Sequence, residues 1–422
     1  MDCLNRSKQV ITRREFLRSI AFVSAGAMGY SLGWKPCFVQ ATTPGVTGNR
    51  VIWVHDGQAT SWNGTTGHYR DHVDQSRVDK MIERGVIELT GESSSIGAWQ
   101  QIIPNYSQGK KIAIKVNINN SANDTSIDAL PQPVNGVIAG LKSIGVAESD
   151  IYVMEPSRTF PTAIGDPILT KYPDVYIWDV SWGQTYGNGT SYNSGDPSLT
   201  IRHGLYPSLT DSKLPDQLKD ASYLINMPIL KGHYQMAEIT LTFKNNFGFF
   251  RPGTSISKFH SYCFPASGSY SYANNPLIDI YQNTHIKDKT VLIIGDALFA
   301  HRITNSGIPE VWNTFGGEFP NSLFFSSDPV AIDSVMWDFS NAEYAKVTEG
   351  QLYLHRAMEV GLGTHEHWNN ATDKSYTTID FVKSDMADVR RLDIDREIKK
   401  FKDGHSEEQD VKDLIKEYME PT

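Results

Sequence analysis

The chain has 422 residues, of which 40% are hydrophobic and 21% are charged. This composition is typical of globular domains and supplies enough apolar side chains for a core. The formal net charge is −9 at pH 7, and a surface of that sign disfavours nucleic acids and anionic membranes as partners.

The N-terminus has the parts of a secretory signal. A positive region with Arg13-Arg14 and Phe16-Leu17 precedes an apolar stretch at 20–34, and Val39-Gln40-Ala41 follows as a small-x-small cleavage site. Paired arginines followed by Phe-Leu are typical of the twin-arginine route. We therefore predict a signal peptide at residues 1–41, the twin-arginine translocase as a partner, and a periplasmic or otherwise extracytoplasmic location. A basic amphipathic first helix is the alternative.

Cleavage after Ala41 would leave Cys263 as the single cysteine and give the mature chain a net charge of −13. The mature chain would then hold neither a Cys-ligated iron–sulfur cluster nor a thiolate zinc site. No later segment has 18 apolar residues in succession, so no transmembrane segment is expected after cleavage. Export in the folded state often follows uptake of a cofactor. The identity of a cofactor is left open, and a metal ion is one candidate.

After a linker at 42–50, strand patterns alternate with helical patterns along the chain. This order predicts an α/β domain over 42–375, with a mostly parallel sheet flanked by helices in Rossmann-like layers. A stretch rich in Gly, Ser and Asn at 182–215 predicts a long loop or an irregular hairpin. The expected strands are 51–54, 111–117, 151–154, 175–178, 221–227, 291–296 and 322–325, and the expected helices are 74–84, 133–144 and 329–339.

The character of the chain changes at about residue 380, where charged helical patterns begin. One helix is expected from Arg391 to Gly404, and Ser406 with Gln409 matches a capping box for a second helix. We predict a small helical hairpin over 380–422, appended to the main domain.

Three polar segments follow expected strands, where ligands of open α/β sheets usually bind. In the first segment, Lys115 and Asn117 alternate with apolar residues and would share one side of a strand end. A lysine on an apolar strand is costly to bury unless an anion lies beside it. We expect both side chains to bind a ligand; a lysine that reaches solvent from an edge strand is the alternative.

The second segment follows the strand at 221–227 and concentrates lysines, a histidine and amides in one stretch. Lys231, His233 and Lys244 are its candidate catalytic residues, because lysine binds carboxylates or phosphates and histidine transfers protons or binds metals. Asn245 and Asn246 are candidate ligand-binding residues of the same stretch. A loop that only satisfies its own backbone is the alternative.

The third segment begins the helix at 329–339. Asp328 is either its N-cap or a ligand-binding residue, and Asp333, in the second turn, is placed to meet a lysine of the pocket. His260 is a further candidate that would close over the pocket. His365-Glu366-His367 offers metal ligands on a Gly-flanked loop, without helical spacing.

These polar segments resemble the signature of a known family, the domain of unknown function 362 family, over roughly residues 50–370. The resemblance implies a fold and a site region but no settled reaction, and the N-terminal signal fits an exported branch. Other members carry ferredoxin modules, whereas this chain lacks a cysteine cluster. The matching blocks are Lys115-Val116-Asn117, 219–221, Asn226-Met227-Pro228, Lys231-Gly232-His233, Thr240-Leu241, 244–248, Asp296-Ala297-Leu298 and 327–333.

Three functions remain open from the sequence. The first is an exported enzyme that holds a small anionic substrate with Lys115, Lys231 and Lys244 and uses His233 as acid or base, with or without a metal. The second is a non-catalytic cofactor- or metal-binding accessory subunit of an extracytoplasmic redox complex. The third is a metal-binding protein without catalysis. The sequence has no GxGxxG, Walker or Gly-x-Ser-x-Gly motif, which disfavours ordinary nucleotide-binding and serine-hydrolase functions.

Overall fold

The computed structural model describes residues 48–388, except for 120–124, 181–184, 187, 207–208, 234–237, 251–255, 264–268 and 346–350, together with residues 409 and 412. The chain divides into two units, Met1–Val39 and Gln40–Thr422, and all the described residues belong to the second. The expected signal peptide lies outside the described residues. Of the hairpin expected over 380–422, only 380–388, 409 and 412 are described, and 380–385 form a strand that pairs with the first strand of the main sheet.

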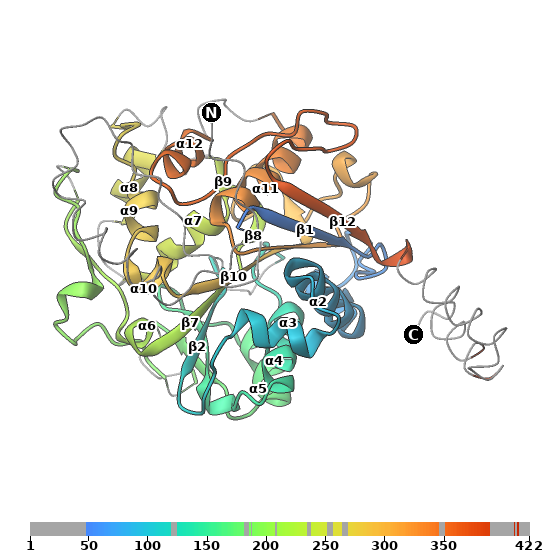
Figure 1. Ribbon diagram of the computed structural model, residues 1–422, viewed down its shortest axis with the longest axis horizontal. Helices are drawn as coiled ribbons and strands as arrows, with labels where there is room; N and C mark the ends of the chain where they lie inside the picture. Colours follow the sequence, from blue (N-terminus) through green and yellow to red (C-terminus); the bar gives the residue numbers. More distant parts are fainter. Residues whose placement is uncertain are drawn as a thin grey trace, which may run out of the picture. The chain divides into compact units, whose positions relative to one another are not determined.

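The described residues form an α/β fold around one large mixed sheet of ten strands (Figure 1). Its order is β12-β1-β11-β10-β7-β2-β3-β4, with β8 beside β10 and β9 beside β8. Most neighbours are parallel, and β11 is antiparallel to both β1 and β10. The strands are β1 (Arg50–His55), β2 (Lys111–Lys115), β3 (Ile151–Glu155), β4 (Tyr176–Asp179), β7 (Ala221–Asn226), β8 (Ile229–His233), β9 (Glu238–Thr240), β10 (Thr290–His301), β11 (Ser322–Ser326) and β12 (Asp380–Asp385).

Helices cover both faces of the sheet, and alternating strand residues supply the two cores. On β2, Ile112 and Ile114 belong to the core shared with α2, α3, α4 and α5, whereas Ala113 belongs to the core on the opposite face. The opposite core includes residues of α7 to α12 (Figure 1). The helices are α2 (Gln75–Thr90), α3 (Ser95–Ile102), α4 (Pro131–Ser143), α5 (Thr162–Lys171), α6 (Asp216–Asp220), α7 (Thr242–Asn245), α8 (Ile256–Cys263), α9 (Pro276–Tyr281), α10 (Thr284–Lys287), α11 (Pro329–Glu343) and α12 (Leu352–Glu359).

Local sequence signals set several helix boundaries. The Asp74 carboxylate accepts a hydrogen bond from the Arg77 backbone N–H at 3.0 Å and begins α2. Gly91 ends that helix in the left-handed region, with φ at 74°. Asp328 begins α11 as its N-cap and accepts hydrogen bonds from the Val330 and Ala331 N–H groups. These are the charged caps and glycine ends that helix termini favour.

The expected alternation of strands and helices is confirmed, and the structure adds elements that were not predicted. Residues 229–233, for which no element was predicted, form β8, which pairs with β10 and β9. The stretch at 182–215 contains a minimal hairpin, in which β5 (Thr200–Ile201) pairs with β6 (Ser212–Lys213). Helices α3, α5 to α10 and α12 and strands β9 and β12 were not expected either.

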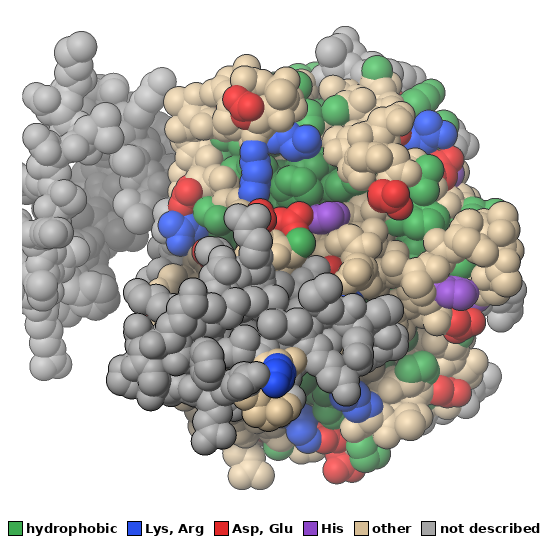
Figure 2. Space-filling model, turned by 90° about the vertical axis from the view of Figure 1, so that its right-hand side faces the viewer, with side chains coloured by type: hydrophobic (Ala, Val, Ile, Leu, Met, Phe, Trp, Pro, Cys, Tyr) green, Lys and Arg blue, Asp and Glu red, His purple; other side chains and the backbone are tan. Residues whose placement is uncertain are grey.

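Two surface properties bear on possible partners. None of the described helices is both long and apolar enough to cross a membrane. On the face shown in Figure 2, the acidic and basic side chains of the described residues lie interspersed among hydrophobic ones, and these described residues form no continuous basic patch.

Candidate functional site

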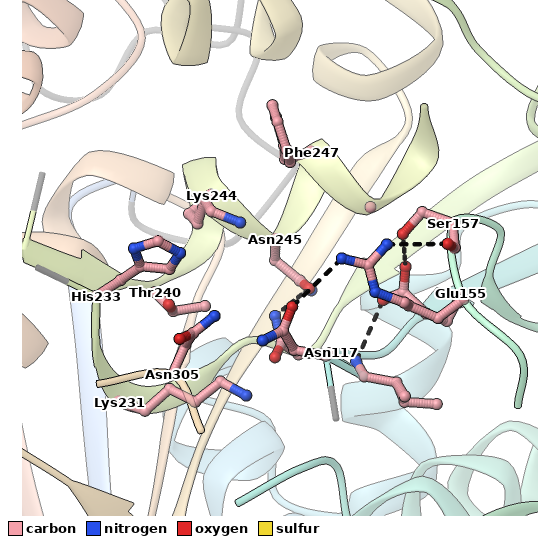
Figure 3. A pocket seen from close by; sticks show the side chains of 14 residues that line it. Asn117, Glu155, Ser157, Lys231, His233, Thr240, Lys244, Asn245, Phe247 and Asn305 are labelled. Carbon is pink, nitrogen blue, oxygen red and sulfur yellow. Dashed lines mark hydrogen bonds between the residues drawn. The ribbon is translucent and has the colours of Figure 1, made fainter. Parts of the chain in front are cut away.

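A small polar cavity lies where β2, β3, β7 and β8 end (Figure 3). Its volume is about 30 Å³. Strands β7, β2 and β3 are adjacent and parallel, so their carboxyl ends meet at one edge of the sheet, as in other open α/β folds. The cavity is lined by Asn117, Ile118, Asn119, Glu155, Ser157, Arg158, Lys231, His233, Thr240, Lys244, Asn245, Phe247, Gly248 and Asn305.

Lys115 lies under this cavity in a buried ion pair. Its Nζ is 2.7 Å from Glu155 Oε2 and also donates to the Val116 carbonyl at 2.6 Å. The side chain is completely buried on a central strand, which excludes the edge-strand alternative. Burial lowers the pKa of Lys115, and the Glu155 carboxylate opposes that effect. The anion beside Lys115 is therefore a residue of the protein.

Four asparagines form a chain of hydrogen bonds that starts at the cavity. Asn117 Nδ2 donates to Asn245 Oδ1 at 3.0 Å, and Asn245 Nδ2 donates to Asn226 Oδ1 at 2.7 Å. Asn226 Nδ2 donates to Asn246 Oδ1 at 3.3 Å, and Asn246 Nδ2 donates to the Thr242 carbonyl. All four donate in the same direction, so each amide polarises the next. The chain fixes Asn117 and Asn245 in the cavity wall, while Asn246 is buried behind them.

Lys231 enters the cavity from β8, beside a second carboxylate. Its Nζ donates to the Ile127 carbonyl at 3.0 Å and lies 3.6 Å from Asp128 Oδ1. Burial lowers the pKa of Lys231, and Asp128 opposes that effect. The nearby Asp296 is also buried, and burial raises its pKa to about 7.

The strand geometry of β8 places Lys231 and His233 on one face, because alternate residues of a strand point the same way. Gly232 between them is required by packing. A Cβ at this position would lie 2.5 Å from the Ile303 carbonyl carbon and 2.6 Å from the Arg302 oxygen. The backbone after β10 therefore crosses β8 at a distance that only glycine permits.

Lys244 and Arg158 line the same cavity without a carboxylate partner among the described residues. Lys244, on α7, is half-buried and has its Nζ 4.7 Å from the centre of the Phe247 ring. Burial lowers the pKa of Lys244 to about 8, and the positive charge of Arg158 adds to that effect. Arg158 is also half-buried, and it donates to the Ser157 carbonyl at 3.0 Å and to Asn119 Oδ1 at 3.5 Å.

His233 is the neutral side chain of the site. Burial lowers its pKa to about 2, and the neighbouring Lys244 and His260 contribute to the decrease. His260, on α8, stacks against His233 with ring centres 5.4 Å apart, but it does not line the cavity. His233 Nδ1, Asn117 Oδ1 and Thr240 Oγ1 are buried and have no hydrogen-bond partner in the described part of the chain.

The structure places Asp328 and Asp333 outside the cavity lining, in supporting positions on α11. The Asp333 carboxylate accepts hydrogen bonds from the Thr242 and Phe243 N–H groups at 2.9 and 3.3 Å and so holds the start of α7, the helix that carries Lys244. Asp328 caps α11 and also accepts a hydrogen bond from the Thr364 N–H. Burial raises the pKa of each carboxyl to about 7.

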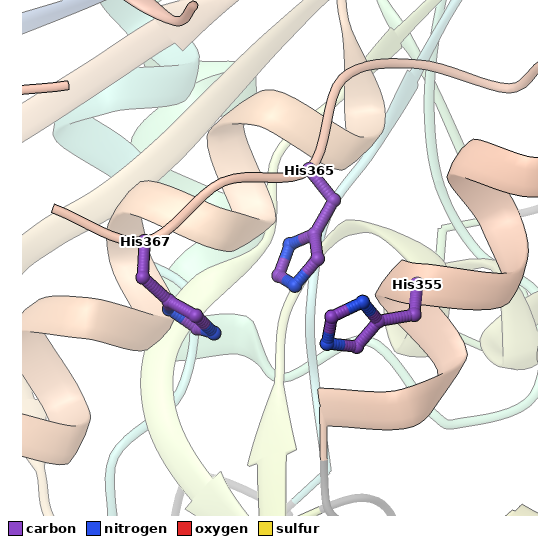
Figure 4. A group of neighbouring side chains, drawn as sticks. All are labelled: His355, His365 and His367. Carbon is purple, nitrogen blue, oxygen red and sulfur yellow. The ribbon is translucent and has the colours of Figure 1, made fainter. Parts of the chain in front are cut away.

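A second group of titratable side chains lies elsewhere. His355, His365 and His367 bring their ring nitrogens within 4.8 Å of one another (Figure 4). Burial lowers the pKa of His365 to about 3. Three imidazoles at this separation are able to hold a metal ion. Glu366, between two of these histidines, instead accepts hydrogen bonds from the backbone N–H groups at 377–379.

Five of the predicted site residues line the cavity, and other lining residues were not predicted; the five are Asn117, Lys231, His233, Lys244 and Asn245. Glu155, Ser157 and Arg158 follow the third strand directly, so the rule that ligands bind at strand ends would have found them. His355 was missed because it lies on α12, whereas His365 lies in the segment after that helix, so the two histidines have no regular spacing along the chain.

Fold and site together define an α/β protein with a cationic, amide-lined cavity at the carboxyl ends of its parallel strands. The chain belongs to the family described as domain of unknown function (DUF362), whose model matches residues 112–338. The cavity lies wholly within the matched residues, and the three clustered histidines lie after them. No curated protein matches the chain.

Proposed function

We propose that the cavity binds a small oxyanion, a carboxylate or a phosphate group, as part of an enzyme's substrate. The observation that carries this proposal is the pair Lys244 and Arg158, two half-buried cations that line one cavity and have no carboxylate partner among the described residues. A buried cation is costly unless an anion accompanies it.

The charges of the cavity favour an anion of one or two negative charges. Four cations lie in or beside the cavity: Lys115, Lys231, Lys244 and Arg158. The Glu155 carboxylate is paired with Lys115, and the Asp128 carboxylate lies beside Lys231, so two of the four positive charges are offset within the protein. Lys244 and Arg158 are left to be offset by a ligand. A cavity of about 30 Å³ holds only a few non-hydrogen atoms, which matches an oxyanion group and not a whole nucleotide.

Lys244 is the better candidate for proton transfer, in place of His233. A general acid or base acts best when its pKa lies near the working pH. Burial brings the pKa of Lys244 to about 8, whereas it takes the pKa of His233 to about 2. In this proposal Lys244 exchanges a proton with the ligand, and neutral His233 offers its unpartnered Nδ1 as a hydrogen-bonding atom.

Calorimetric titration of the full chain with phosphate, acetate and a 2-hydroxy carboxylate tests this proposal, with chloride as the reference anion. At least one oxyanion is expected to bind, and Lys244→Met and Arg158→Gln are each expected to weaken binding tenfold or more, on the order of a charge-assisted hydrogen bond. Lys289→Met is the matched control, because Lys289 is also half-buried, with a pKa lowered by burial to about 8, but lies outside the cavity. Equal affinities in all four proteins would refute the proposed site.

We further propose that the protein is exported in the folded state by the twin-arginine route. The support is the sequence itself: Arg13-Arg14 followed by Phe16-Leu17, the apolar stretch and the small-x-small site ending at Ala41. Replacing both arginines by lysine is expected to retain the precursor in the cytoplasm. Cell fractionation with immunoblotting measures this, and normal processing of the double variant would contradict the route.

A further inference from the structure

Three histidines from two chain segments surround one point. His355 lies on α12, and His365 and His367 lie on the segment between α12 and β12 (Figure 4). Their ligand atoms lie within 4.8 Å of one another. Nitrogens bound to one tetrahedral zinc are about 3.3 Å apart, since each Zn–N bond is about 2.0–2.1 Å. Small side-chain rotations would therefore close the site around an ion.

The hydrogen bonds of His365 fix which of its nitrogens is free. Ser334 Oγ donates to the Val330 carbonyl at 2.6 Å, so its proton is not available to the imidazole. His365 Nδ1 lies 2.7 Å from the same Oγ and must be the donor there. The neutral ring then has a lone pair on Nε2, which is buried and has no partner among the described residues.

His367 is oriented in the same way by a carboxylate. Its Nδ1 lies against Asp338 Oδ1, which fixes Nδ1 as the protonated nitrogen. Asp338 is held in turn by the Trp368 N–H and the Tyr376 hydroxyl, at 2.8 and 2.9 Å. His367 Nε2 is again buried and has no partner among the described residues. A carboxylate behind a histidine is a recurring support of metal ligands.

From this arrangement we propose that His355, His365 and His367 bind a divalent transition-metal ion such as Zn²⁺. Without an ion, the Nε2 lone pairs of His365 and His367 are buried and have no partner among the described residues, and a cation offsets that cost. Imidazole nitrogen suits zinc, copper or nickel better than calcium or magnesium, which prefer oxygen. The three histidines supply three of the four ligands that a tetrahedral zinc ion takes, so the fourth would be water or another ligand.

This site is independent of the oxyanion cavity, because the two share no residue. The histidines also lie beyond the residues that the family model matches, although Ser334 and Asp338, which orient them, lie at its end. The site thus adds a metal function to this chain that does not depend on the proposed reaction.

Calorimetric titration with ZnCl₂ tests the proposal on the full chain, purified without a histidine tag and treated with a chelator. One equivalent is expected to bind. His365→Gln and His367→Gln are each expected to lower the affinity by a factor on the order of 100 or more, and Asp338→Asn by about 10–100-fold with all three ligands still present. His72→Gln is the control, because His72 is a half-buried histidine outside the cluster that keeps its own bond to the Thr66 carbonyl.

Circular dichroism of each variant shows whether it is folded. His367 is half-buried, so we expect His367→Gln to fold, and its zinc affinity can be measured even if the buried site of His365→Gln prevents that variant from folding. Stoichiometric zinc in the wild type and in His72→Gln, with loss in His367→Gln, supports the site. Absence of saturable binding, or an unchanged affinity in folded His367→Gln, overturns it. Because metal is measured directly, failure of the oxyanion proposal leaves this result unaffected.

Discussion

Lys115 Nζ lies 2.7 Å from Glu155 Oε2, and neither side chain is more than 3% exposed. The pair joins the ends of β2 and β3 directly below the cavity. Glu155 is further held by the Ser157 hydroxyl and the Ile118 N–H, at 2.8 and 3.2 Å. A buried ion pair with this many hydrogen bonds fixes the geometry of a site more than it raises stability.

Removing one partner of this pair is therefore expected to cost more than removing both. Lys115→Met should lower the free energy of unfolding by about 3–5 kcal/mol, because it leaves the Glu155 carboxylate buried and unpaired. The double variant Lys115→Met/Glu155→Gln should recover much of that loss. Urea denaturation measures all three proteins. A double variant no more stable than Lys115→Met would show that the ion pair is not the reason for the loss.

The buried charge of Lys244 is expected to lower the free energy of unfolding while it strengthens ligand binding. In the folded protein burial lowers its pKa to about 8, from an ordinary value of 10.5, so the folded state binds fewer protons between those two pH values. Stability contributed by this group therefore rises with pH in that window, and below pH 8 the full cost of burying the charge is present. Lys244→Met should be more stable than the wild type at pH 7, by on the order of 1–3 kcal/mol.

The same difference should shrink as the pH approaches 10.5, and it should shrink at pH 7 when a bound oxyanion offsets the charge. Thermal unfolding at pH 7 and pH 10, with and without phosphate, measures this. Lys289→Met serves as the comparison for a lysine with a similarly lowered pKa and no cavity. A destabilised Lys244→Met at pH 7 without phosphate would contradict the account.

A substitution within the chain of hydrogen-bonded asparagines is expected to change both the stability of the protein and ligand binding in the cavity. Asn245→Leu removes the acceptor of Asn117 and the donor to Asn226, and leaves both buried amides partly unsatisfied. We expect a loss of about 1–3 kcal/mol in the free energy of unfolding for each unsatisfied group, and weaker oxyanion binding. Asn369→Leu, at an exposed amide, is the control. Unchanged stability on chemical denaturation would argue against the chain.

Two glycines are predicted to tolerate no methyl group. At Gly248 a Cβ would lie 2.4 Å from Glu155 Oε1 and 2.6 Å from Lys115 Nζ, and at Gly232 it would meet backbone atoms. Gly248→Ala should cost about 1–3 kcal/mol as overpacking, and Gly232→Ala more, because backbone yields less than side-chain ends. Gly204→Ala is the control, since a Cβ there meets nothing within 4 Å. Equal melting temperatures for the three variants would rule out the close contacts.

Most of the fold was predictable because both faces of the sheet are buried. Strands such as 111–117 and 291–296 are continuous apolar runs between turn residues, and they were found within a few residues of their true ends. Strand β8 was missed because Lys231, Gly232 and His233 have no strand propensity. Their pairing partner, β10, lies about 70 residues further along the chain, where Asp296 pairs with Ile229 and His301 with Lys231.

The site was predictable where polar motifs follow a buried strand along the chain, as Asn117 follows β2, and Lys244 and Asn245 on α7 were predicted from such a motif. Lys115 was expected to meet an anion, but the sequence does not show that the anion is Glu155, because the pairing depends on the adjacency of β2 and β3. Asp333 was expected to face a lysine and instead binds the N–H groups that begin α7. Which group each polar side chain contacts depends on tertiary packing, and the spacing of residues along the chain does not reveal it.

Helix α11 supports both sites at once. Near its start, Asp328 accepts a hydrogen bond from the Thr364 N–H, one residue before His365 of the proposed metal site, and one turn later Asp333 holds the start of the helix that carries Lys244. Two binding equilibria supported by one rigid element obey reciprocity: whatever factor an ion at the histidines applies to oxyanion affinity, the oxyanion must apply to ion affinity. One titration, repeated with the other ligand present, would give the coupling free energy transmitted through this helix.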